Sequence, residues 1–136
     1  LRCVYCGDKA TEWEHLHPIV KGRLPTGYPS SIRNLVPSCN KCNESKGGKE
    51  WRDWITSNAP RSPKSRKVPN LDKRISRLER YEKWAKCSRM PLVKVVGKDI
   101  YEEYFGKLDH IISEMKEAQA MASILKAKIE AVVNHQ

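Results

Sequence analysis

The chain has 136 residues, 39% of them apolar and 31% charged, and this length fits one small domain or a very small domain with an appendage. The mean hydropathy of -0.68 and the absence of any apolar run of about 18 residues exclude a membrane span. Lys and Arg number 26 against 16 Asp and Glu, a net charge of +10. This favours nucleic acid over an anionic membrane surface as the partner, and a basic protein without such a partner is the alternative.

The positive charge is concentrated in the first two-thirds of the chain. Residues 1–70 hold 13 basic and 6 acidic side chains and residues 71–97 hold 8 and 3, whereas residues 98–136 hold 5 and 7. The last third is therefore not expected to be the main nucleic-acid contact. No basic-then-apolar leader opens the chain, so we expect a cytoplasmic protein. Leu1 is not an initiator methionine, so further residues can precede it.

The first twelve residues contain one of two cysteine pairs. Cys3 and Cys6 form a C-x-x-C pair and Cys39 and Cys42 a second, while Cys87 stands alone. Two such pairs favour a structural tetrahedral zinc site over a disulfide scaffold, and a dithiol redox motif would explain one pair but not two. The gap between the pairs exceeds the roughly 15–20 residues of a simple zinc ribbon, so a further segment is inserted there. Cys87 is expected to be a buried or idle thiol.

The inserted segment predicts a hairpin. Residues 13–20 carry aromatic and β-branched side chains and predict a short strand interrupted at Pro18. Residues 21–31 are rich in Gly, Pro and Ser and predict a loop. The short apolar stretch 34–37 then predicts the second strand.

A helical segment through Trp51, Trp54 and Ile55 is expected after the second cysteine pair. Together these elements form a predicted domain at residues 1–57. Burial of apolar side chains alone would not make so small a domain stable, so it also needs the zinc ion. Trp51 and Trp54, like Trp13, are expected in its core, with stacking on splayed bases as the alternative.

The remaining residues predict a basic linker at 58–70 and a helical region at 71–136. The linker is rich in Pro, Ser, Arg and Lys. It is expected to be an exposed connector, an arm that binds the phosphates along a nucleic acid, or both. Residues 71–87 predict a helix with one apolar side and a basic remainder that includes the cluster 73–80. Pro91 and Gly97 bracket a short β-branched run.

A long helix is predicted over residues 98–134. Its apolar or small side chains recur in steps of three and four, at Leu108, Ile111, Met115, Ala118, Ala122, Leu125, Ile129 and Val132. This is a seven-residue hydrophobic repeat. The helix can therefore pack within the chain or form a homodimer with a second copy.

Polar residues near the cysteine pairs form an ordered pattern. Glu14 and His15 begin E-H-x-x-P, Asn34 begins N-L-V, and Asn43 and Lys46 complete C-x-x-C-N-x-x-K. In this order the pattern resembles the HNH endonuclease family, over about residues 3–55. The resemblance implies a small zinc-stapled core of the ββα-metal fold. Together with the mainly helical C-terminal region predicted from its hydrophobic spacing, this gives an α+β chain.

The resemblance also implies the role of each matching position. Glu14 corresponds to the metal-binding acidic residue, His15 to the general base, Asn34 to the asparagine that braces the loop and helps orient the histidine, and Asn43 to the second metal ligand. Glu14 stands where Asp is more usual, which lengthens the reach to the metal by one methylene. The loop from His15 to Asn34 is also longer than in compact members of the family.

Phosphodiester hydrolysis suits these residue types. The oxygens of Glu14 and Asn43 are hard ligands that favour Mg²⁺ or Mn²⁺, whereas the thiolates favour zinc. A neutral His15 can accept a proton from water at physiological pH. His17 is either an auxiliary ligand or base, or a residue that hydrogen-bonds phosphate or backbone.

The expected function is a restriction-type HNH endonuclease that cuts DNA to leave 5′-phosphate and 3′-hydroxyl ends. The side chains expected to contact nucleic acid are Lys46, Lys49, Arg52, Arg66, Lys67 and Arg74, and the basic cluster 73–80 is expected to hold the backbone. Two other functions stay open. One is a non-catalytic zinc-containing nucleic-acid-binding module, and the other is a scaffold assembled through the last helix.

Overall fold

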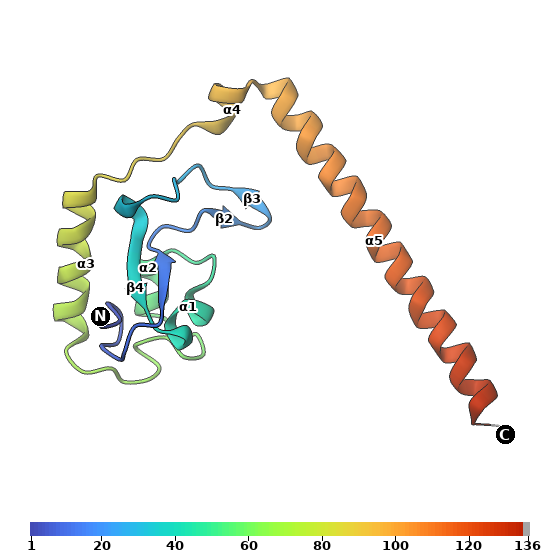
Figure 1. The fold of residues 1–136 in the computed structure, drawn as a ribbon, viewed down its shortest axis with the longest axis horizontal. Helices are drawn as coiled ribbons and strands as arrows, with labels where there is room; N and C mark the ends of the chain where they lie inside the picture. The colour runs from blue at the N-terminus through green and yellow to red at the C-terminus, as the bar shows by residue number, and fades with distance from the viewer. Residues whose placement is uncertain (135–136) are drawn as a thin grey trace. The chain divides into compact units, whose positions relative to one another are not determined.

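The computed structural model describes residues 1–134, and the chain divides into two units, Leu1–Pro91 and Leu92–Gln136 (Figure 1). The first unit contains both cysteine pairs, two small antiparallel sheets and the first three α-helices. The second unit is helical. The fold class is therefore confirmed as α+β with a helical C-terminal region. None of the described helices has the length and apolar character needed to cross a membrane.

The central hairpin pairs strand β1 (Glu12–His15) with β4 (Leu35–Ser38). Alternation along β1 turns Glu14 into the core, whereas Trp13 on the opposite face is 55% exposed. The strand ends before the predicted interruption at Pro18. Asn34 belongs to a 3₁₀ turn, η1 (Ile32–Asn34), rather than to the second strand.

The inserted loop forms a second, smaller hairpin. Strand β2 (Val20–Lys21) pairs with β3 (Leu24–Pro25), although residues 21–31 were expected to form only a loop. Gly22 and Arg23 both adopt positive φ in the turn between these strands. Two such residues in succession match the right-handed twist of a tight hairpin.

Two short helices follow the second cysteine pair. Helix α1 (Asn40–Lys46) starts directly after Cys39 and ends at Gly47, whose φ of 47° is the left-handed conformation that glycine adopts readily. Helix α2 (Trp51–Ile55) carries Trp51 and Trp54 into the core, as predicted, where both are 1% exposed.

Helix α3 (Leu71–Ala85) belongs to the first unit, although the sequence grouped it with the last helix. Leu78 is part of the buried core, and Leu71, Ile75 and Tyr81 pack against that core. The preceding segment is also partly packed rather than fully exposed, because Ser62 and Pro63 are buried. The local pattern predicted the apolar side of this helix, but it did not indicate the surface on which that side packs.

The second unit consists of helix α4 (Leu92–Val96) and helix α5 (Lys98–Val133). The β-branched run at 92–96 is thus helical. Helix α5 confirms the predicted long helix, and none of its described residues is buried within the chain. Its apolar repeat therefore faces solvent in the single chain, with Met115, Leu125 and Ile129 each more than half exposed.

Candidate active site and zinc centre

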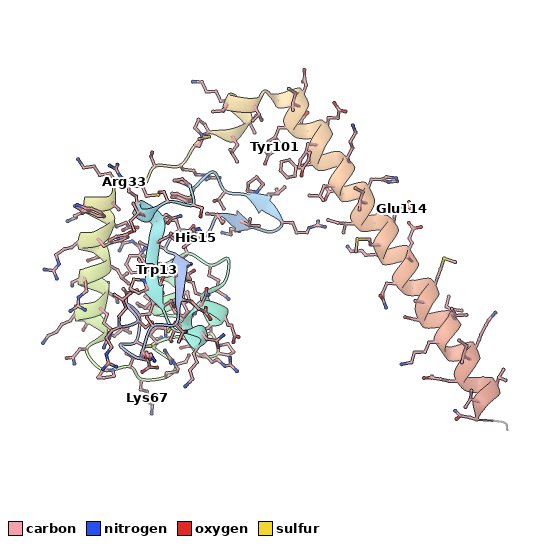
Figure 2. All side chains as sticks on the ribbon, in the orientation of Figure 1. Trp13, His15, Arg33, Lys67, Tyr101 and Glu114 are labelled. Carbon is pink, nitrogen blue, oxygen red and sulfur yellow. The ribbon has the colours of Figure 1, made fainter. Side chains whose placement is uncertain are left out.

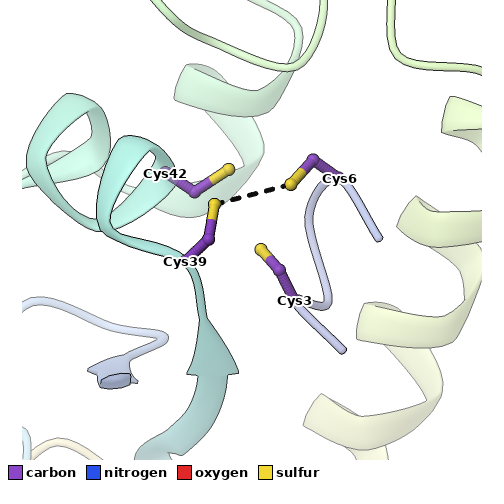
Figure 3. A group of neighbouring side chains, drawn as sticks. All are labelled: Cys3, Cys6, Cys39 and Cys42. Atoms are coloured by element: carbon purple, nitrogen blue, oxygen red, sulfur yellow. Dashed lines mark hydrogen bonds between the residues drawn. The ribbon is translucent and has the colours of Figure 1, made fainter. Parts of the chain in front are cut away.

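The four paired cysteines meet at one point. Cys3 and Cys6 come from the N-terminal turn, and Cys39 and Cys42 from the start of α1 (Figure 3). Their sulfur atoms lie within 4.8 Å of one another, and all four residues are buried. A tetrahedral zinc with Zn–S bonds of about 2.3 Å separates its sulfurs by about 3.8 Å. The cluster therefore fits a structural zinc ion, and Cys87 takes no part in it.

Thiol ionisation in this cluster also favours a cation. A hydrogen bond with the Cys42 thiol lowers the pKa of Cys3 to about 4, and the same contact raises the pKa of Cys42. Burial raises the pKa of Cys6 to about 11. Four adjacent buried thiols cannot all ionise by themselves, whereas a dication among them stabilises four thiolates.

Arg66 connects the segment after α2 to this cluster. Its Nη2 atom lies 3.0 Å from the Cys42 sulfur and its Nη1 atom 3.7 Å from a carboxylate oxygen of Asp8. Its Nε atom is buried without a hydrogen-bond partner among the described residues. The guanidinium charge therefore balances the thiolates instead of facing solvent.

We expect Arg66→Met to lower the zinc affinity about 10- to 100-fold, the usual effect of losing an outer-shell partner of a metal site. Competition with a chromophoric chelator would measure this affinity. Lys67→Met removes the neighbouring exposed cation and serves as the control. Equal zinc affinity of the Arg66 variant and the parent would contradict this role of Arg66.

A second cluster of candidate residues lines a small cavity along the free edge of β1. Glu14 and His15 line it from the strand, Asn43 from α1, and Gly47 and Gly48 from the turn after α1. The remaining lining residues are Trp13, Pro18, Ile19 and Val20. The structure thus brings together the three residues predicted to carry the chemistry, and Figure 2 shows His15 and Trp13 on this hairpin.

Glu14 is held in a buried hydrogen-bond network. Its Oε1 atom accepts a 2.7 Å hydrogen bond from Lys46 Nζ, and its Oε2 atom accepts one of 2.7 Å from the Tyr5 hydroxyl. Lys46 is fully buried and Glu14 is 5% exposed. Burial raises the pKa of Glu14 above its ordinary value, although Lys46 and Tyr5 act in the opposite direction. Each carboxylate oxygen keeps a further lone pair for another ligand.

His15 is part-exposed at the mouth of the cavity. Its Nε2 atom lies 2.8 Å from the Ser30 hydroxyl. Partial burial and the Lys46 charge both lower the pKa of His15 from 6.5. The ring is therefore neutral at physiological pH and can accept a proton.

Asn34 is fully buried and ties together the loop around His17. Its Oδ1 atom accepts a hydrogen bond from the His17 N–H, and its Nδ2 atom donates to the carbonyls of His17 and Pro29. These contacts brace the chain immediately after His15. An orienting effect on the histidine itself stays a prediction.

His17 lies on the other side of the strand end, away from the cavity lining. Its two ring nitrogens lie 3.5 Å from Glu50 and 3.1 Å from Glu82, and its ring stacks on Tyr28. These contacts are structural. They differ from both sequence interpretations of His17, because its partners are carboxylates.

Asn43 contacts Glu12, a residue that was not predicted from the sequence to belong near the site. Its Nδ2 atom donates a short hydrogen bond to Glu12, which precedes Glu14 by two positions on the same face of β1. The strand alternation E-x-E was the available signal. Glu12 does not line the cavity, and it holds the amide of Asn43, so the oxygen donors that line the cavity are Glu14 and Asn43.

Three of the side chains predicted to contact nucleic acid pair with other groups of the protein. Lys46 is buried against Glu14, so its assignment as a surface phosphate contact is wrong. Arg52 pairs with Glu79 and Glu82, and Arg66 contacts the cysteine cluster.

The other three predicted contacts differ in their exposure. Lys49 and Lys67 are exposed. The guanidinium of Arg74 lies over Gly7, whose φ of +87° no side chain adopts readily, and a Cβ there would come within 2.5 Å of that guanidinium. Arg74 thus covers the first cysteine turn as well.

A hairpin and a helix joined at a cluster of four cysteines, with a histidine, a carboxylate and an amide beside the hairpin, have the arrangement of a ββα-metal domain. Residues 3–49 match the sequence model of the HNH endonuclease family, and this part of the chain belongs to that family. The resemblance seen in the sequence is thereby confirmed. Comparisons with curated proteins and with solved structures gave no match. The HNH domain makes the chain a nuclease or nucleic-acid-binding module and implies interaction with DNA.

Proposed function

We propose that this protein is a metal-dependent endonuclease that hydrolyses DNA phosphodiester bonds at the cavity beside β1. The observation that carries the proposal is the convergence of Glu14, His15 and Asn43 on one cavity. These three side chains, from β1 and α1, can therefore act on the same phosphate group. Lys49 and Lys67 are exposed cations that can bind the DNA backbone.

The chemistry follows from the roles of these groups. A Mg²⁺ or Mn²⁺ ion held by Glu14 and Asn43 would polarise the phosphate and stabilise the leaving oxygen. Neutral His15 takes a proton from the attacking water, and Ser30 fixes the ring through its 2.8 Å hydrogen bond. Water oxygen bonds to phosphorus as the bond to the 3′ oxygen breaks. The products are a 5′-phosphate and, after protonation by solvent, a 3′-hydroxyl.

A restriction-type role requires cleavage of both strands, and a single HNH site cuts one. The exposed heptad repeat of α5 offers a surface for a homodimer, which would supply the second site. We propose this pairing as part of the function. The cytoplasmic location expected from the sequence also stays a prediction.

The test is cleavage of supercoiled plasmid in Mg²⁺ or Mn²⁺ by the parent protein and by His15→Ala. We expect the variant to lose about 10²- to 10⁴-fold in rate, the usual contribution of a general base, while its DNA affinity is retained. His110→Ala, an exposed histidine on α5, is the control. Linear product would support paired sites, and nicked circles alone would argue against them.

Two results would reject the nuclease proposal. One is equal cutting by the parent and His15→Ala. The other is tight DNA binding without cutting by either protein, which would favour the non-catalytic zinc-containing nucleic-acid-binding module. The hydrogen bonds that occupy both oxygens of Glu14 are the observation in favour of that second function.

A further inference from the structure

Two acidic residues of helix α3 pair with a residue outside the helix. Its acidic residues Glu79 and Glu82 turn toward the rest of the first unit, where both pair with Arg52. Glu82 also accepts a hydrogen bond from Trp51 and lies 3.1 Å from His17. Both carboxylates thus have partners outside the helix, and Glu79 also borders the hollow that the cations of α3 line.

The face of α3 that points away from the core carries a row of exposed cations, which we call the α3 basic face. It consists of Lys73, Arg77, Arg80 and Lys83, which line a shallow hollow together with Asp72, Ser76 and Glu79. None of the four cations has an ion pair within residues 1–134. Steps of three and four residues align them along about 15 Å of helix. Such a row matches the spacing of successive phosphates better than it matches a single small anion.

This face lies on the far side of the hairpin from the candidate active site. The Tyr81 hydroxyl donates to the carbonyls of Ile32 and Leu35, which places α3 along the outer edge of β4. The cavity with His15 and Asn43 lies along the free edge of β1. In Figure 1, α3 and α1 accordingly flank the hairpin from opposite sides. A duplex seated in the cavity therefore lies beside the edge of the hairpin opposite to the one that α3 covers.

We propose that the α3 basic face is a second nucleic-acid site, which binds the phosphate backbone of a segment other than the one in the cavity. This inference rests on the proposed function only for the occupant of the cavity. Charge complementarity identifies the ligand: the residues that line the hollow include four cations against two carboxylates, and none of them is apolar. The protein would then hold two DNA segments at once.

The experiment is a two-duplex capture assay on the full-length zinc-loaded chain carrying His15→Ala, so that no cleavage occurs. The protein is bound to an immobilised 12-base-pair duplex, and a labelled duplex of the same length is then added. The α3 variant is K73Q/R77Q/R80Q/K83Q. The control is K107Q/K116Q/K126Q/K128Q, which removes the same charge from α5. Circular dichroism verifies that all proteins are folded.

We expect the parent and the control to capture the labelled duplex and the α3 variant to lose at least 10-fold of that capture, while all three still bind the immobilised duplex. The salt slope of total binding should also fall by about 0.9 for each phosphate that the variant no longer neutralises. If the α3 variant fails to bind the immobilised duplex, both surfaces serve one site and the inference is wrong. If the variant equals the parent throughout, the second duplex binds elsewhere, for example in the second cavity of the proposed homodimer, and the inference is equally wrong.

The two proposals fail separately. Capture depends on binding alone, so it is informative even where plasmid cleavage is absent. Equal plasmid cleavage with and without His15 would overturn the nuclease proposal and leave the capture result unchanged.

Discussion

Removal of zinc is expected to unfold the first unit. Cys39→Ser should have the same effect, because three thiolates hold the ion far less tightly than four. Structural zinc sites contribute an apparent binding free energy of about 10–16 kcal/mol, which is at least as large as the whole stability of a typical small domain. The two halves of the cluster come from residues far apart in sequence, so the ion joins the N-terminal turn to α1.

Tryptophan fluorescence would measure this effect with and without a chelator. Trp51 and Trp54 are 1% exposed, so unfolding should shift their emission to longer wavelength. Cys87→Ser is the matched control, because this fifth cysteine lies outside the cluster and should leave emission and melting unchanged. If the chelated protein kept the emission and melting of the parent, the zinc would not support the fold.

Lys46→Met is expected to destabilise the first unit by about 3–5 kcal/mol, the usual cost of removing one partner of a buried ion pair. Lys46 is fully buried, and its ammonium group donates to Glu14 and to the carbonyl of His15. The variant would leave the Glu14 carboxylate buried with only the Tyr5 hydroxyl as its partner. Urea unfolding followed by tryptophan emission would measure the loss.

Two further variants make the interpretation specific. Lys49→Met removes an exposed lysine three positions away and should change the free energy of unfolding by less than about 0.5 kcal/mol. Adding Glu14→Gln to Lys46→Met removes the stranded charge and should restore part of the lost stability. An unchanged midpoint for Lys46→Met alone would show that this pair does not stabilise the fold.

Local spacing explains why the metal-binding elements could be predicted. Two C-x-x-C pairs fix which sulfurs can share an ion, because two intervening residues allow both thiols of a turn to face one point. The order of Glu14, His15, Asn34 and Asn43 relative to these pairs indicated which residues would gather at the hairpin. The seven-residue repeat likewise predicted α5, since that period is a property of the helix alone.

Burial and pairing of long side chains could not be predicted in this way. Lys46, Arg52 and Arg66 resemble surface cations in the sequence, yet each meets a partner that is remote along the chain. Trp13 is a large aromatic residue and was expected in the core, but it is 55% exposed beside the cavity. Neighbouring residues of a strand face opposite sides, and in β1 the buried side is that of Glu14. Such outcomes depend on which elements pack together.

The sequence by itself determined the cluster of four cysteines, the match of residues 3–49 to the HNH family and the long last helix, because spacing and period act over a few residues. Only the tertiary structure decided that α3 packs on the core of the first unit, that its glutamates at 79 and 82 pair with Arg52, and that Glu14 pairs with Lys46. The physical reason is that a charged side chain is buried or exposed according to the partners that folding brings to it.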